Sequence, residues 1–230
     1  MVENVSLVGF FPIKLTFFEV YMEKVLRKLG SIPFGHGVLL SLLQGYRRPN
    51  DKIADLLAKG VLLPVRRGLY VLGPEERTEP ISLPLVANIL YGPSYVSLEY
   101  ALSRYGLIPE GVFDVTSVTL RRSRVMTNPL GRFSYKHLPQ PVYGIGVRAE
   151  QEGKAAFLLA SPEKALCDLI MLTRGLPYMS VAAMRSWLLE HHRMDEDILR
   201  EMDRQVVLDC AAAGYKARYL RVLAKALESL

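Results

Sequence analysis

Apolar residues recur at helical spacing in three segments before residue 60, which predicts three consecutive helices. The first segment, residues 16–30, opens with a capping box at Thr16, where Thr16 and the glutamate three positions later satisfy each other's backbone N–H groups. The second covers residues 37–44. The third covers residues 51–59, with Asn50 expected as its N-cap.

Two short apolar runs, 62–65 and 69–72, follow the third segment and have the composition of strands. Between them Gly68 can supply the positive φ that a tight turn requires, so we expect a hairpin with Arg66 and Arg67 at its tip. Three helices followed by a hairpin is the order of a winged helix. The second and third helices would form the helix-turn-helix, and the hairpin would form the wing.

Basic residues cluster where a winged helix would meet DNA. Residues 44–72 hold six basic and two acidic residues, and four of the basic ones lie at the start of the third helix and at the hairpin tip. The start of a recognition helix reaches base edges in the major groove, and arginine suits both guanine edges and phosphates. The alternative is a winged helix used for protein contact, with a solvated basic face. The residues expected to bind DNA are Arg47, Arg48, Asn50, Lys52, Lys59, Arg66 and Arg67.

A charged, proline-flanked linker, "GPEERTEP" at residues 73–80, then separates two predicted domains, 1–76 and 77–230. The first includes an N-terminal extension, 1–15. The second is expected to be an α+β domain to about residue 172, followed by a helical tail over 176–230. Its helices are predicted at residues 83–92, 97–106 and from 161 onward, and its short antiparallel strands at residues 115–120, 125–127, 132–138, 142–147 and 155–159.

The second domain has a basic stretch of its own. On the strand 132–138 a period of two places basic and small polar side chains on one face and Phe133, Tyr135 and His137 on the other, which we expect to be the core. The basic side could contact nucleic acid, an acidic partner or only water. Its residues are Arg121, Arg122, Arg124, Arg132 and Lys136.

Composition adds a modest bias toward anionic partners. The chain has 230 residues, half of them hydrophobic, and a net charge of +6 with a pI near 9.3. The apolar stretch 5–20 is interrupted by Pro12, Lys14 and Glu19, so we expect no membrane span there. The two cysteines are expected to be buried thiols in a cytoplasmic protein.

Five blocks of sequence, taken in order, resemble the AbiEi family, the antitoxins of abortive-infection, type IV toxin–antitoxin systems. The resemblance covers roughly residues 37–172. The blocks are "GVLLPVRRGLYVL" (60–72), "GPSYVSLEYALSRYGLIPE" (92–110), "TSVTLRRSR" (116–124), "NPLGRFSYKHL" (128–138) and "ASPEKALCDLI" (160–170).

The resemblance implies a winged helix that binds repeats of double-stranded DNA in its own operon promoter and represses it, and it is compatible with a dimer on the DNA. It also implies a C-terminal domain that neutralises a nucleotidyltransferase-type toxin, directly or indirectly. No catalytic residue, metal or cofactor is expected. In the C-terminal blocks the residues themselves are explained more readily as helix caps and turns that hold the fold together than as contacts with a partner.

Two further alternatives remain, beside a winged helix used for protein contact. One is a sequence-specific DNA-binding regulator that has no toxin partner. The other is a metal-dependent nuclease, because Asp114 followed by Glu152 and Lys154 fits a loose pattern of two carboxylates and a lysine. We expect no enzyme, since residues 152–154 are predicted to lie in a hairpin turn rather than on a rigid strand.

Overall fold

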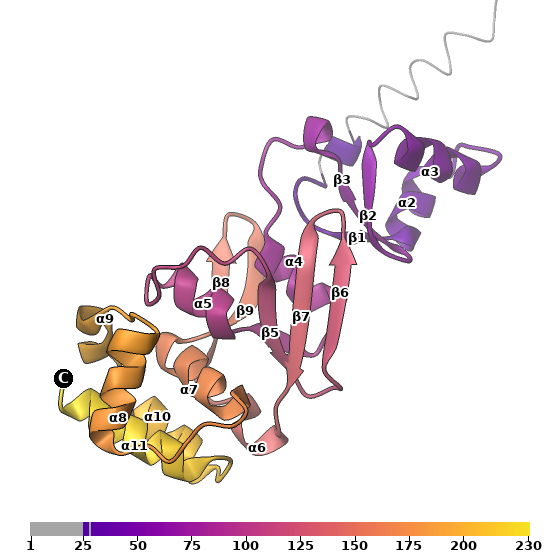
Figure 1. Cartoon of the computed structure of the whole chain (residues 1–230). Coiled ribbons are helices and arrows are strands. Elements are labelled where there is room, and N and C mark those ends of the chain that lie inside the picture. The colour runs from indigo at the N-terminus through magenta and orange to yellow at the C-terminus, as the bar shows by residue number, and fades with distance from the viewer. Residues whose placement is uncertain (1–24, 28) are drawn as a thin grey trace, which may run out of the picture. The chain divides into compact units, whose positions relative to one another are not determined.

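The computed structural model describes residues 25–27 and 29–230, which form two compact units (Figure 1). Unit 1 extends to Ile81 and unit 2 begins at Ser82, whereas the sequence places the boundary between residues 76 and 77. Most of the first predicted helix, 16–30, and the N-terminal extension lie outside the described residues. Residues 25–27 are helical.

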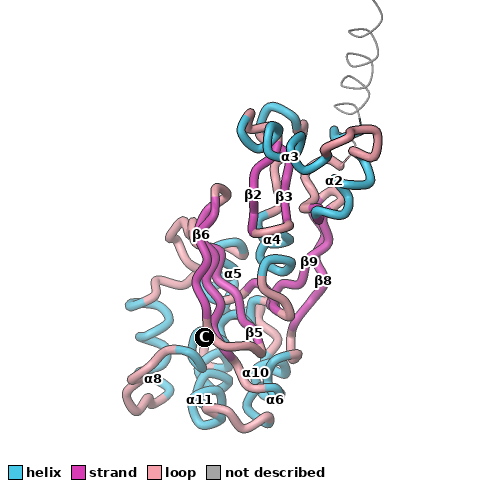
Figure 2. The backbone as a smooth tube through the Cα atoms, turned by 90° about the vertical axis from the view of Figure 1, so that its right-hand side faces the viewer, coloured by secondary structure: helices cyan, strands magenta, loops and turns pink. Residues whose placement is uncertain are grey.

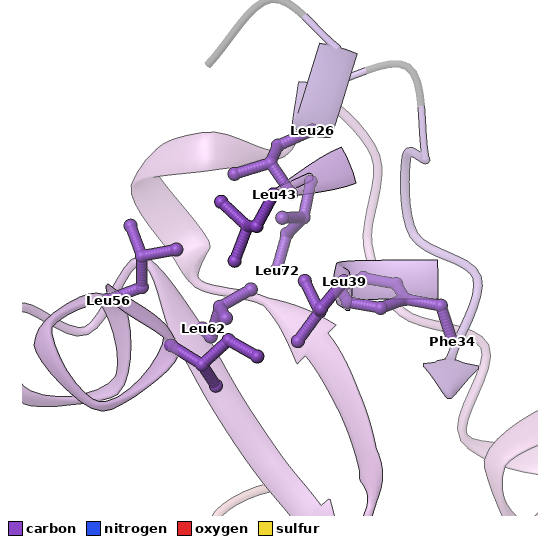
Figure 3. Packing of buried hydrophobic residues seen from close by; sticks show 8 residues of the cluster. Leu26, Phe34, Leu39, Leu43, Leu56, Leu62 and Leu72 are labelled. Atoms are coloured by element: carbon purple, nitrogen blue, oxygen red, sulfur yellow. The ribbon is translucent and has the colours of Figure 1, made fainter. Parts of the chain in front are cut away.

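Unit 1 combines short helices with a three-stranded antiparallel sheet of order β1-β3-β2. Leucine side chains from its helices and its hairpin meet in one core, where Leu39, Leu62 and Leu72 are completely buried (Figure 3). The elements of unit 1 are β1 (Phe34–Gly35), α2 (His36–Leu42), α3 (Pro49–Ala58), β2 (Leu62–Arg66), β3 (Leu69–Leu72) and a 3-10 turn (Pro74–Glu76).

The start of α3 differs from the prediction. Asn50 is the second residue of the helix, and Arg48 occupies the N-cap position without a capping hydrogen bond from its side chain. Pro49 explains the shift, because its fixed φ suits the first helical position and its missing N–H would have no partner there. Asn50 is therefore available for contacts outside the helix.

Unit 2 contains a six-stranded sheet of order β6-β7-β5-β4-β9-β8 with helices packed on it, so the predicted α+β class is confirmed (Figure 2). The prediction that these strands are all antiparallel is wrong for two pairs, because β4–β9 and β5–β7 are parallel, whereas the other neighbours are antiparallel. The strands are β4 (Ser94–Val96), β5 (Val115–Thr119), β6 (Arg124–Asn128), β7 (Gly131–His137), β8 (Val147–Glu152) and β9 (Ala155–Ala160).

Some helices of unit 2 alternate with the strands of this sheet along the sequence, and after β9 all elements are helical. The predicted cap of α7 is confirmed, because the Ser161 hydroxyl accepts a hydrogen bond from the Lys164 backbone N–H. The helices are α4 (Leu83–Leu90), α5 (Leu98–Arg104), α6 (Gln140–Tyr143), α7 (Pro162–Leu172), α8 (Val181–Ser186), a π-helical turn (Trp187–His191), α9 (Glu196–Arg200), α10 (Arg204–Ala212) and α11 (Ala217–Glu228).

The strand predicted at 142–147 is wrong. The short helix α6 and a turn occupy this stretch, and β8 begins only at Val147. Gly146 has a φ of +68°, and a Cβ there would lie 2.9 Å from the Cβ of Lys164, so the backbone turns closely over α7. Because β8 is a largely exposed edge strand, it lacks the apolar alternation that reveals a strand in sequence.

A buried polar network joins the sheet to α7. Lys164 and Asp168 form an ion pair at 2.8 Å with both side chains completely buried. The Tyr95 hydroxyl and the Ser97 hydroxyl donate to Asp168 at 2.9 and 2.8 Å, and the Lys164 ammonium donates to the Val142 carbonyl at 2.6 Å. Burial raises the pKa of Asp168, and Lys164 and the two hydroxyl donors oppose that effect.

This network changes the expected role of Ser97. The residue occupies the N-cap position of α5, as predicted, but its hydroxyl donates to Asp168 and makes no capping hydrogen bond. Two of the blocks that resemble the AbiEi family, 92–110 and 160–170, therefore meet in the interior of unit 2. Cys167 and Cys210 are also buried and are free thiols.

We predict that Lys164→Met and Asp168→Asn each lower the free energy of unfolding of unit 2 by about 3–5 kcal/mol, because each leaves one buried charge uncompensated. The double variant should be destabilised by clearly less than the sum of the two, since neither charge remains. Urea unfolding followed by the fluorescence of Trp187, the chain's single tryptophan, measures this. Additive effects would contradict a coupled ion pair.

Candidate nucleic-acid interface

The turn between α2 and α3 and the first turn of α3 carry exposed polar side chains. Arg47, Arg48 and Asn50 are all exposed. Because no side chain caps α3, the N–H groups of its first turn point outward with the partial positive charge of a helix N-terminus. This end of the helix therefore combines hydrogen-bond donors, an amide side chain and guanidinium groups.

Acidic partners neutralise part of the predicted basic set. Arg48 pairs with Asp51 at 2.9 Å, and Lys52 and Lys59 both pair with Asp55, at 3.3 and 3.0 Å. The hydrogen bond from Lys59 is the main cause that holds the pKa of Asp55 below its usual value. The Lys52 side chain is also only 15% exposed and lies over the Tyr46 ring. The Lys52 ammonium is thus largely withdrawn from solvent, whereas Lys59 stays exposed and shares the Asp55 carboxylate with Lys52.

The hairpin tip has the predicted geometry. Gly68 has a φ of +76°, and Arg66 ends β2 directly before the turn. The Gly68 carbonyl accepts a hydrogen bond from the His36 backbone N–H at 2.9 Å, so the turn is tied to the first residue of α2. Arg66 and Arg67 are exposed, and within residues 25–27 and 29–230 neither of them, nor Arg47, forms an ion pair.

The basic residues predicted in the second domain do not share one surface. Arg124 pairs in register with Tyr135, whose hydroxyl donates to the Ala87 carbonyl of α4, so both side chains leave the sheet on the face that α4 covers. Lys136 is the next residue after Tyr135 and points to the opposite face. Arg132 lies at the other end of β7, where it pairs with Asp114 at 3.0 Å.

The predicted core face of β7 is confirmed for Phe133 and Tyr135, which are buried, and is wrong for His137. His137 ends the strand and is exposed. Its backbone N–H donates to the Ser123 hydroxyl, and its ring Nδ1 lies 3.1 Å from the Arg121 carbonyl. The histidine therefore fixes the loop between β5 and β6 instead of entering the core.

A residue that the sequence did not single out organises the remaining arginines. The guanidinium carbons of Arg121 and Arg124 lie 5.4 and 5.7 Å from the centre of the Tyr91 ring. The Tyr91 hydroxyl donates to the Arg122 carbonyl at 3.2 Å. Tyr91 directly follows α4, far before these arginines in the sequence, and no local pattern links the two segments.

The structure does not bring the nuclease residues together. Asp114 pairs with Arg132 and precedes β5, whereas Glu152 pairs with Arg104 at 2.6 Å and ends β8. Three strand spacings separate β5 from β8, which is about 14 Å at about 4.8 Å each. Among the described residues no group of three or more histidine, cysteine, aspartate or glutamate side chains is placed to hold a metal ion.

The chain is similar in fold to a protein of known structure. The crystal structure of the RV2827C protein from Mycobacterium tuberculosis is similar to this chain with a TM-score of 0.53 and 16% sequence identity, over 91% of this chain and 81% of that one. At this identity the similarity concerns the fold alone. No family model and no curated protein matches the sequence.

None of the helices within residues 25–27 and 29–230 has both the length and the apolarity that crossing a membrane requires.

Proposed function

We propose that the chain is a DNA-binding transcriptional regulator and that unit 1 is a winged helix-turn-helix. The arrangement that supports this is the pairing of β1 with β3, which ties the wing to α2 while α3 follows α2 after a short turn. In that topology the second helix of the pair enters the major groove and the wing touches the neighbouring backbone or minor groove.

The observation that carries the proposal is the charge at the two expected contact points. Arg47 lies before α3, and Arg66 and Arg67 lie at the wing tip, all three exposed and without ion pairs in the described part of the chain. Asn50 projects from the first turn of α3, and an amide there can read an adenine edge. Arg47, Arg66 and Arg67 would contact phosphates or guanine edges.

The wider role that we propose is that of an antitoxin and autorepressor of a toxin–antitoxin operon, and it rests on the resemblance to the AbiEi family. Unit 1 would bind operator DNA in the promoter of its own gene, and unit 2 would act against a nucleotidyltransferase-type toxin. A regulator without a toxin partner is the second candidate. It is favoured by the burial of residues 160–170. Because this block lies in the core, its resemblance to the AbiEi family is explained by the shared fold and does not indicate a partner-binding surface.

The wing is tested by Arg66→Gln together with Arg67→Gln in the full chain. Binding to the duplex upstream of the chain's own gene is measured by fluorescence anisotropy at several salt concentrations. We expect weaker binding and a slope of log K against log salt that is smaller by about 0.9 for each phosphate that the wing no longer neutralises. The control Lys154→Gln with Arg174→Gln removes the same charge from exposed positions of unit 2 and should bind like the wild type. An unchanged slope in the wing variant would refute the wing assignment.

The start of α3 is tested by Asp51→Asn. This change removes the carboxylate that pairs with Arg48 at the helix end expected to face DNA. Less repulsion from phosphate and a freed guanidinium should tighten duplex binding several-fold, although the helix loses about 0.3–1 kcal/mol of dipole stabilisation. Asp209→Asn in α10 is the matched control and should leave affinity unchanged. If Asp51→Asn bound the duplex as tightly as the wild type or more weakly, the start of α3 would not be the DNA contact.

The antitoxin role is tested by co-expression with a nucleotidyltransferase encoded next to this gene. Growth and promoter activity are scored separately. We expect the wild type to restore growth and to repress the promoter, and the wing variant to restore growth without repression. Failure of the wild type to restore growth, with repression intact, would favour the regulator without a toxin partner.

A further inference from the structure

In unit 2 two arginines place their guanidinium groups near the Tyr91 ring, and the backbone carbonyl of a third accepts a hydrogen bond from the Tyr91 hydroxyl. Arg121 and Arg122 lie in the loop between β5 and β6, and Arg124 begins β6. All three are exposed, and the guanidinium groups of Arg121 and Arg124 lie 5.4 and 5.7 Å from the Tyr91 ring centre. We call these four residues the Tyr91 cluster. No carboxylate in the described part of the chain forms an ion pair with any of its arginines.

The backbone that carries the cluster is fixed by hydrogen bonds. The Arg121 backbone N–H donates to the Thr119 hydroxyl, which itself donates to the Pro93 carbonyl. The Tyr91 hydroxyl donates to the Arg122 carbonyl. On the other side of the loop His137 contacts both the Ser123 hydroxyl and the Arg121 carbonyl. A ligand would therefore meet guanidinium groups whose supporting backbone is already ordered, which reduces the entropic cost of binding.

Grouped like charges need a compensating partner. The electron-rich face of an aromatic ring attracts a nearby cation, and the half-buried Tyr91 ring provides this attraction for both Arg121 and Arg124. The positive charges still repel each other, and a bound anion would remove that repulsion. Guanidinium groups match phosphate oxygens by forming two parallel hydrogen bonds.

The cluster fits the backbone of a duplex better than a single strand. Proteins that bind single strands stack bases on free aromatic faces. The Tyr91 ring is already in contact with two guanidinium groups, and Tyr135 packs on it in a T-shaped arrangement at 5.1 Å. The cluster thus offers charge for phosphates without a free ring for bases.

We propose that the Tyr91 cluster is a second DNA contact, through which unit 2 binds backbone phosphates of the duplex held by unit 1. This inference rests on the proposed DNA binding of unit 1. Because the two units belong to one chain, the second contact is intramolecular once the first has formed, so it adds affinity without reading sequence.

The test is the full chain with Arg121→Gln, Arg122→Gln and Arg124→Gln combined, measured by anisotropy on the duplex upstream of the gene and on a scrambled duplex. The salt slope should fall by about 1–3, corresponding to one to three phosphate contacts. Affinity for both duplexes should fall by a similar factor, so that the preference between them is retained. The matched control is Lys154→Gln, Arg174→Gln and Arg221→Gln, which removes three exposed charges elsewhere in unit 2 and should keep the wild-type slope.

The outcomes separate this inference from the proposed function. If the wild type fails to bind the duplex, both the proposed DNA binding of unit 1 and the second contact in unit 2 are refuted. If the wing variant binds more weakly while the cluster variant keeps the wild-type slope, only the second contact is refuted. Equal weakening in the cluster variant and its control would mean a general charge effect and would refute a specific site. The second DNA contact would also be refuted if the cluster variant bound only a single strand of the same sequence more weakly. It would likewise be refuted if the variant bound the duplex like the wild type but no longer restored growth, since that result would indicate a protein partner.

Discussion

In unit 2 a lysine and an aspartate are both removed completely from water, and the surrounding elements are arranged so that neither charge is left alone. Asp168 receives hydrogen bonds from Tyr95 on β4 and from Ser97 at the start of α5, and Lys164 reaches the carbonyl of Val142 in α6. An uncompensated buried charge costs several kcal/mol, so these contacts specify how the sheet and α7 meet. The backbone at Gly146 also turns closely over α7, since a Cβ there would lie 2.9 Å from the Cβ of Lys164.

On the surface, the presence or absence of a carboxylate partner distinguishes charges that stabilise the fold from charges that are candidates for ligand binding. Lys52 and Lys59 share Asp55 and belong to the surface of α3. Arg66 and Arg67 at the hairpin tip have no such partner in the described part of the chain, and neither have the arginines around Tyr91 in unit 2. Exposed positive charges on fixed backbone, without carboxylates, are the features that a phosphate-binding surface requires. The proposed DNA binding depends on this contrast rather than on the net charge of the chain.

Much of the architecture follows from local sequence signals. The positive φ at Gly68, the cap at Ser161 and the burial of Phe133 and Tyr135 were each predictable, because each depends on one residue and its near neighbours. The predictions that the structure contradicts concern features that depend on distant residues or on competing local effects. Pro49 displaced Asn50 from the cap, and the demands of packing over Lys164 replaced the predicted strand 142–147 with a helix and a turn.

In the candidate site, too, the features set by near neighbours are predictable and those set by distant residues are not. The sequence identified the arginines, but it did not reveal that Asp51 and Asp55 neutralise some of the basic residues of α3, because side-chain pairing depends on the exact start of the helix. The sequence also predicts a single surface formed by Arg121, Arg122, Arg124, Arg132 and Lys136. The pairing of β6 with β7 splits them, and the contact of Tyr91 with two of them crosses from α4 to the sheet.

The most direct measurement of the central claim is the set of backbone amide chemical shifts of the full chain, recorded while a duplex from the region upstream of its gene is added. At 25.9 kDa the chain is small enough for such spectra. We expect the largest changes within unit 1 at residues 47–52 and 66–68, at the start of α3 and at the wing tip. Saturable binding that leaves these amides unchanged and shifts mainly those of α8–α11 would contradict the central claim.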